Sequence, residues 1–146
     1  MKGLIMATRS LTIVKESLSL STKELVVIYK QTDGYPEGMG LKLVNFLEGF
    51  IIINGIPPNP EPKSANGMNC LAAQLVAELT NGIGKIYLYP SRTRNICEEY
   101  IYYIYLGTNN TLRIRTVQTY LKTGSEMSEK VIFDGTPSEM KEWLVE

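Results

Sequence analysis

The chain has 146 residues, of which 44% are hydrophobic and 21% are charged. This mixture is typical of a globular protein, and the length suits a single domain over residues 1–146. Fifteen basic side chains balance fifteen acidic ones, so no net charge draws the chain to DNA or to an anionic membrane. We therefore expect no sequence-specific nucleic-acid partner and no membrane association.

Histidine is absent, which restricts the catalytic chemistry. No Ser-His-Asp or Cys-His site can form, and the commonest zinc ligand is missing. The two cysteines, Cys70 and Cys97, form no CxxC pair, and this pattern fits a reducing cytoplasm. The first residues lack the features of a signal peptide, and an alternative start at Met6 would make residues 1–5 a dispensable leader. We predict a cytoplasmic protein without a cofactor.

The first part of the chain predicts a hairpin followed by a helix and a loop. Apolar, β-branched runs at residues 11–14 and 25–29 flank a Ser-rich segment, which is typical of two antiparallel strands. Apolar residues then recur at helical spacing, which predicts a helix over about residues 37–50 with Pro36 at its first turn. Residues 54–67 are rich in proline and predict a long loop, either a mobile linker or a lid over a site.

The second part predicts a core helix, several hairpin strands and a terminal helix. The core helix covers about residues 66–79, with Asn66 as its N-cap and Gly82 in a left-handed stop. Strand-like runs follow at residues 86–89, 100–106, 112–119 and 130–133. A capping box that begins at Thr136 starts the last helix. This order predicts an α+β domain, with a mainly antiparallel sheet of about five to six strands and two to three helices packed on one face.

The segment from Thr32 to Gly40 is the most unusual turn in the chain, because it combines three glycines, a proline and two carboxylates. The helix that follows presents free amides, and Gly38 would let a ligand approach them closely. Asp33 and Glu37 would oppose a phosphate there and could instead cap the amides themselves. The spacing matches neither a P-loop nor a dinucleotide-binding motif, so both interpretations stay open.

Carboxylates suggest a second kind of site. Asp33 and Glu37 could bind a divalent cation with Glu98 or Glu99 if the fold gathers them, and Lys30 precedes the turn. Such a cluster would suit a metal-dependent hydrolase of nucleotides or phosphodiesters. The simpler interpretation makes Glu98 and Glu99 solvated charges at the edge of a strand. We predict no catalytic residue and no metal ligand, and enzyme activity stays the alternative.

Arginine and tyrosine side chains suggest a third kind of site. Arg113 and Arg115 must share one face of their strand, because strand side chains alternate between faces. Four tyrosines precede them on the neighbouring strand: Tyr100, Tyr102, Tyr103 and Tyr105. Guanidinium groups beside such rings would suit stacking on a base and pairing with its phosphate. The same residues are enriched at protein–protein interfaces, and a plain solvated sheet face is equally consistent.

Short stretches along the chain form a recurring set: ATRS at residues 7–10, DGYPEG at 33–38, ANGM at 65–68, LAAQ at 71–74 and YLYP at 87–90. This set resembles an uncharacterised group of small proteins of phages and other prokaryotic mobile elements. In similar sequences a histidine or an aromatic residue often precedes the DGYP turn. Here Gln31 and Thr32 occupy that place, so no role for an imidazole is inherited. The resemblance implies a small protein that acts in the host cytoplasm and binds something of the host.

Together these patterns predict a non-catalytic binding protein of a phage or mobile element, which forms a homo-oligomer. Its partner would be a small polar ligand, such as a nucleotide, or a host protein. The alternatives are the metal-dependent hydrolase and a homo-oligomeric structural or assembly protein. The residues predicted to bind the ligand are Thr8, Arg9, Asp33, Gly34, Tyr35, Glu37, Gly38, Asn66, Arg113 and Arg115.

Overall fold

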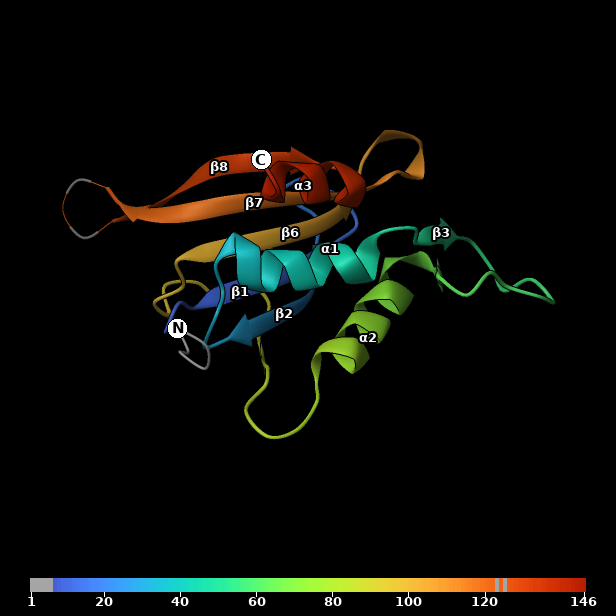
Figure 1. Ribbon diagram of the computed structural model, residues 1–146, viewed down its shortest axis with the longest axis horizontal. Helices are drawn as coiled ribbons and strands as arrows, with labels where there is room; N and C mark the ends of the chain where they lie inside the picture. Colours follow the sequence, from blue (N-terminus) through green and yellow to red (C-terminus); the bar gives the residue numbers. More distant parts are fainter. Residues whose placement is uncertain (1–6, 123, 125) are drawn as a thin grey trace.

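The computed structural model describes residues 7–122, 124 and 126–146, so the leader expected at residues 1–5 lies outside the described residues. A six-stranded sheet carries three α-helices on one face (Figure 1). The strands are β1 (Ser10–Lys15), β2 (Glu24–Lys30), β3 (Ile51–Ile53), β4 (Ser64–Asn66), β5 (Tyr87–Tyr89), β6 (Tyr100–Leu106), β7 (Leu112–Leu121) and β8 (Met127–Gly135). The helices are α1 (Leu41–Leu47), α2 (Gly67–Leu79) and α3 (Pro137–Leu144), with a π-helical turn at Pro36–Gly40 and a short 3₁₀ turn at Thr108–Asn110.

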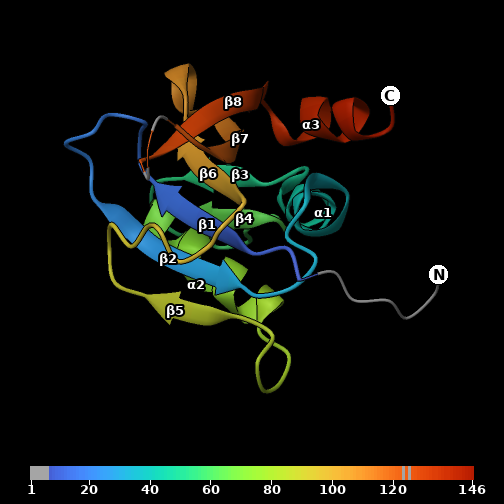
Figure 2. The same ribbon diagram turned by 90° about the vertical axis from the view of Figure 1, so that its left-hand side faces the viewer.

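The main sheet has the strand order β5-β2-β1-β6-β7-β8. Every neighbouring pair is antiparallel except β1 and β6, which run parallel at the centre. The view in Figure 2 shows β5 and β8 at the two edges of this twisted sheet. The predicted α+β class, the mainly antiparallel sheet and the helices on one face are confirmed.

The core lies between the sheet and the three helices. Alternate side chains of the strands, such as Ile28 and Ile104, pack there against Leu43 of α1, Leu71 of α2 and Met140 of α3, and all are fully buried. Each such side chain contributes roughly 1.5–3 kcal/mol to folding. A smaller apolar cluster covers part of the opposite sheet face: Leu11, Ile13, Val27, Tyr29, Ile101 and Val117. The sheet is therefore buried on one face and partly covered on the other.

Local predictions differ from the structure at two places in the first half. The helix expected over residues 37–50 begins as the π-helical turn and ends at Leu47, and Gly49 then takes a φ of +84°. The Pro-rich loop ends earlier than expected, because β3 and β4 pair in parallel as a small separate sheet. Short parallel pairs of this kind leave little periodic signal in a sequence.

The two predicted helix caps have opposite outcomes. At α3, Thr136 accepts a hydrogen bond from the Glu139 amide at 3.2 Å, and the Glu139 carboxylate accepts one from the Thr136 amide at 2.8 Å. This capping box is confirmed. Asn66 makes no cap for α2, because its side-chain oxygen accepts a hydrogen bond from the Gly55 amide at 2.7 Å. The prediction of Asn66 as a cap was wrong, since a contact distant in sequence competes for its side chain.

Within the part of the chain that the structure describes, no helix combines the length and the apolar character that crossing a membrane requires.

Candidate functional site

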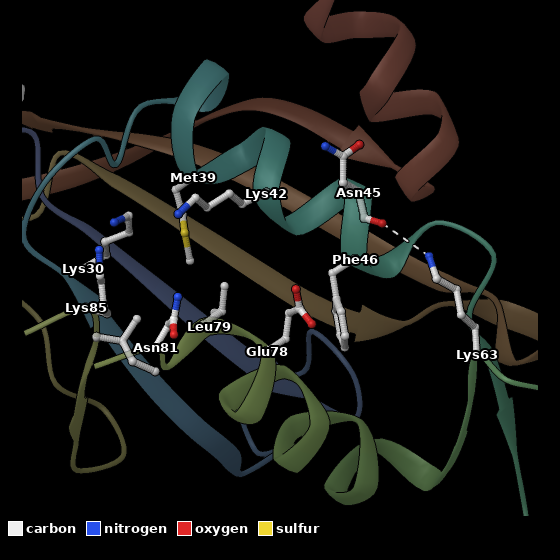
Figure 3. A pocket seen from close by; sticks show the side chains of 11 residues that line it. Lys30, Met39, Lys42, Asn45, Phe46, Lys63, Glu78, Leu79, Asn81 and Lys85 are labelled. Carbon is white, nitrogen blue, oxygen red and sulfur yellow. Dashed lines mark hydrogen bonds between the residues drawn. The ribbon is translucent and has the colours of Figure 1, made fainter. Parts of the chain in front are cut away.

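A cavity of about 450 Å³ lies on the helix side of the sheet (Figure 3). Residues of α1 form one wall, and the C-terminal end of α2 with the segment that follows it forms the other. The last residue of β2 reaches its rim. The volume is within the range of small-molecule sites in proteins.

Three lysines from different elements line this cavity. Lys30 ends β2, Lys42 lies in the first turn of α1, and Lys85 lies in the segment between α2 and β5. Figure 3 shows their side chains gathered on the same side of the cavity. None of the three forms a salt bridge with a carboxylate among the residues that the structure describes. We call Lys30, Lys42 and Lys85 the lysine cluster.

The lysine cluster changes the proton affinity of its most buried member. Burial lowers the pKa of Lys30 below its ordinary value of 10.5, and repulsion by Lys42 and Lys85 lowers it further. The Asp33 carboxylate opposes part of this effect. Like charges that share a site disfavour each other's charged form. The cluster therefore favours a negatively charged group placed among the three ammonium groups.

A fourth lysine at the cavity, Lys63, binds backbone carbonyls of the fold. Its ammonium group donates hydrogen bonds to the carbonyl oxygens of Glu48 at 2.8 Å and Asn45 at 3.3 Å. These carbonyls lie at the C-terminal end of α1, where helix oxygens lack partners within the helix. Figure 3 shows Lys63 away from the lysine cluster. The Lys63 ammonium group thus caps the C-terminal end of α1.

The remaining wall of the cavity is mixed in character. Phe46, Leu79 and Ile86 are half-buried and provide an apolar surface. Glu78, in the last turn of α2, is exposed and has no hydrogen bond or ion pair with another described residue. In Figure 3, Phe46 and Glu78 lie on the other side of the cavity from Lys30 and Lys85. Lys30 and Lys85 thus lie toward one end of the cavity, and Phe46 and Glu78 lie toward the other.

The turn that connects β2 to α1 lies next to this cavity, and several of its amides donate hydrogen bonds within the fold. The Gly34 amide donates to the Thr8 carbonyl at 2.8 Å, and the Met39 amide donates to the Asp33 carbonyl at 2.9 Å. The Tyr102 hydroxyl donates to the Gly34 carbonyl at 2.6 Å. These contacts favour the interpretation in which the protein itself satisfies the turn.

The glycines of the turn allow close packing of protein atoms. A Cβ on Gly34 would lie 2.7 Å from the Ser10 Cβ, and one on Gly38 would collide with the Asp33 carbonyl. A Cβ on Gly40 would lie 2.9 Å from the Met140 side chain. Gly34 and Gly38 would meet Cβ or backbone atoms closer than 3 Å, so both positions need a residue without a side chain, whereas the Met140 methyl near Gly40 ends a flexible side chain that can shift. The glycine pattern thus has a sufficient explanation in packing.

The structure brings some of the predicted ligand-binding residues together at this turn. Thr8 lies beside it, since its carbonyl accepts a hydrogen bond from the Gly34 amide at 2.8 Å, whereas the Arg9 carbonyl accepts one from the Glu99 amide before β6 at 2.8 Å. Tyr35 directs its hydroxyl toward the Asp33 carboxylate at 3.5 Å. The negative charge of Glu37 acts on Tyr100 and, together with burial, raises its pKa. None of the predicted ligand-binding residues lines the cavity that carries the lysine cluster.

Asn66, Arg113 and Arg115 lie apart from the turn. Arg113 and Arg115 do share the sheet face that carries no helix, where both bind Asp134 at 3.3 and 2.7 Å. Tyr105 joins them and donates to Asp134 at 2.6 Å. Asn66 precedes α2, and its side-chain oxygen accepts a hydrogen bond from the Gly55 amide. We call the helix-free side of the sheet the open face.

The open face carries a second cavity, of about 400 Å³, whose lining includes an arginine–glutamate ion pair. Arg94 binds Glu24 at 2.6 Å and lies over the Tyr103 ring at 5.8 Å. Burial and the nearby Glu129 carboxylate raise the pKa of Tyr103 to about 12. Tyr100 and Tyr102 lie on the helix side instead, where Tyr102 is fully buried. The expected row of four tyrosines is thus divided between the two faces.

The prediction about Glu98 has a clear outcome. Glu98 was expected to be a solvated edge charge, and that prediction was wrong, since it is only 6% exposed. Its carboxylate accepts hydrogen bonds from the amides of Asn95 and Ile96 at 2.9 and 2.8 Å, which holds the segment between β5 and β6. No group of three histidine, cysteine, aspartate or glutamate side chains that could hold a metal ion occurs within the described part of the chain.

Comparisons with known proteins assign no functional residues to this chain. The chain has no significant match among protein-family models, among curated proteins or among solved structures.

Proposed function

We propose that this chain is a non-catalytic binding protein that holds a small phosphorylated ligand, such as a nucleotide, in the cavity at the lysine cluster. One observation carries the proposal: three ammonium groups, from β2, α1 and the segment after α2, converge in this cavity. Among the residues that the structure describes, none of them forms a salt bridge with a carboxylate. Holding like charges together costs free energy, and a phosphate among them would offset that cost.

The composition of the cavity supports binding rather than chemistry. Its lysines provide charge and its Phe46, Leu79 and Ile86 side chains provide apolar surface, the combination that a nucleotide with a base and a phosphate requires. A nucleophile would need a neighbouring base to activate it, and the residues that line the cavity form no such pair. The resemblance to proteins of phages and mobile elements extends this proposal to a homo-oligomer that withholds a nucleotide of the host.

Isothermal titration of the full chain with ATP and GTP tests the proposal. We expect both to bind, and we expect the double variant Lys42→Gln/Lys85→Gln to lose roughly tenfold in affinity per lysine, since a hydrogen bond to a charged group contributes about 1.5 kcal/mol. The double variant Lys42→Arg/Lys85→Arg keeps the charge and should keep most of the affinity. Binding should also weaken as salt is added.

A matched control separates the cavity from general attraction by surface charge. Lys130 lies exposed on β8, outside this cavity, so Lys130→Gln removes one positive charge without touching the site. This variant should bind both nucleotides as the unmodified chain does. Unchanged melting temperatures would show that all variants fold. Absence of binding at millimolar ATP and GTP, or equal affinity of the Gln variant, would contradict the proposed function.

A further inference from the structure

The far end of the cavity carries one acidic side chain, Glu78. Glu78 is exposed in the last turn of α2, on the same side of the cavity as Phe46 in Figure 3. Among the described residues it has no hydrogen bond or ion pair, whereas Glu24, Glu98 and Glu129 each hold a partner. Its carboxylate is therefore available as an acceptor within the proposed site.

A carboxylate in this position fixes the orientation of a phosphorylated ligand. It repels phosphate, so the phosphate must occupy the opposite side, beside Lys30, Lys42 and Lys85. The uncharged part of the ligand then lies against the apolar surface at the Glu78 end, which Phe46 provides. Aromatic and aliphatic side chains of this kind are the surfaces on which bases stack. The edge of the base would then face Glu78.

An ionised carboxylate accepts hydrogen bonds and donates none, and its two oxygens can accept two parallel donors. Guanine presents such a pair of adjacent donors, from its ring N1–H and its 2-amino group. Hypoxanthine lacks the 2-amino group and keeps only the ring donor. Adenine offers its 6-amino group beside an unprotonated ring nitrogen, which would face the carboxylate unfavourably. The acceptor pair of Glu78 thus matches guanine better than the other purines.

We infer that Glu78 makes the cavity selective for guanine nucleotides, with the base at the Glu78 end and the phosphates at the lysine cluster. This inference rests on the proposed function, because it assigns the base to a site that the lysines define. It adds one testable property, which is the ratio of affinities between nucleotides that carry the same phosphates. The lysine cluster alone would bind all of them equally.

Titration of the full chain with GTP, ITP and ATP measures this ratio directly. We expect GTP to bind about tenfold more tightly than ITP, which lacks one donor, and ATP to bind more weakly than GTP by at least that factor. The variant Glu78→Gln should reduce the ratio of GTP to ATP affinity to near one. The control Glu142→Gln removes an exposed carboxylate of α3, outside the cavity, and should leave the ratio unchanged.

The ratio also separates recognition from simple repulsion. Loss of a negative charge near phosphates would raise the affinity for all three nucleotides by the same factor, and the ratio would not change. Equal affinities for GTP, ITP and ATP in the unmodified chain would overturn the guanine assignment and leave the phosphate site in place. Failure of all three to bind would overturn both proposals. Circular dichroism of each variant would confirm that this exposed substitution leaves the fold intact.

Discussion

Cationic side chains occur on both sides of the sheet, and the two groups differ in what surrounds them. On the open face, Arg94 binds Glu24, and Arg113 and Arg115 bind Asp134. On the helix side, the lysine cluster has no carboxylate within salt-bridge distance among the described residues. Paired guanidinium groups hold segments of the fold together. The ammonium groups of the lysine cluster repel one another instead, and this contrast is the basis of the proposed phosphate site.

The ion pair on the open face also fixes a strained segment. Between β5 and β6 the chain contains three residues with positive φ other than glycine: Arg92, Asn95 and Cys97. Such conformations each cost of order 1 kcal/mol or more and persist only where neighbouring contacts hold them. The Glu24 carboxylate accepts a hydrogen bond from the Arg92 amide at 2.7 Å as well as binding Arg94. One buried carboxylate therefore secures the start of this segment.

The largest expected effect is on the stability of the open face. The Glu24 side chain is 3% exposed, so Glu24→Gln would leave Arg94 partly buried without a counter-charge. We expect the free energy of unfolding, measured with urea, to fall by about 2 kcal/mol. Nucleotide affinity should stay unchanged, because Glu24 lies outside the lysine cavity. A loss of affinity comparable to that of the lysine variants would mean that the two regions are not independent.

Acid should reduce the difference in the free energy of unfolding between Glu24→Gln and the unmodified chain. Burial alone would raise the pKa of Glu24, but the hydrogen bonds from Arg94 and the Arg92 amide and the nearby positive charges lower it below the ordinary value of 4.5. A carboxyl group whose folded pKa is lowered contributes stability above its unfolded pKa and loses it as the pH falls through the folded pKa. The two proteins should therefore converge in stability only at a pH below 4.5, as the pH falls through the lowered pKa of Glu24.

The next effect concerns the pH dependence of nucleotide binding. The pKa of Lys30 lies below 10.5, so this lysine loses its proton at a lower pH than an exposed lysine does. Phosphate groups are already ionised above neutral pH. We expect the affinity for ATP to be constant near pH 7 and to fall by about tenfold as the pH rises toward 10. Titration across this range measures it, and an affinity independent of pH would show that Lys30 does not take part.

The sequence predicts the elements of this fold better than it predicts the site, and the reason is the range of the interactions. The hairpin of β1 and β2, the core helix α2 and the capping box at Thr136 depend on neighbours in the sequence. The lysine cluster forms only because β2, α1 and the segment before β5 meet in space. No local pattern marks three isolated lysines as one group.

The glycine turn shows a different limit of sequence interpretation. A glycine is required both where a ligand approaches the backbone and where other protein atoms do. At Gly34 and Gly40 the approaching atoms belong to Ser10 and Met140, which the sequence places 24 residues before the first and 100 residues after the second. The turn lies between Lys30 and α1, and it therefore helps to place two walls of the cavity without lining most of it.

The smallest expected effect tests the electrostatic premise without any ligand. Lysine and glutamine have similar helix propensities, so Lys42→Gln in α1 changes little besides the charge. Because Lys42 repels Lys30 more strongly than Lys85 does, we expect this variant to be more stable than the unmodified chain by about 0.3 kcal/mol, with a smaller gain for Lys85→Gln. Lys130→Gln, outside the cavity, should give no gain.

Precise urea denaturation at low salt can resolve this order of stabilities, and the gain in stability should vanish at high salt, where the repulsion is screened. A loss of stability in Lys42→Gln would mean that its ammonium group is stabilised by the fold, and the contrast between paired arginines and unpaired lysines would then fail.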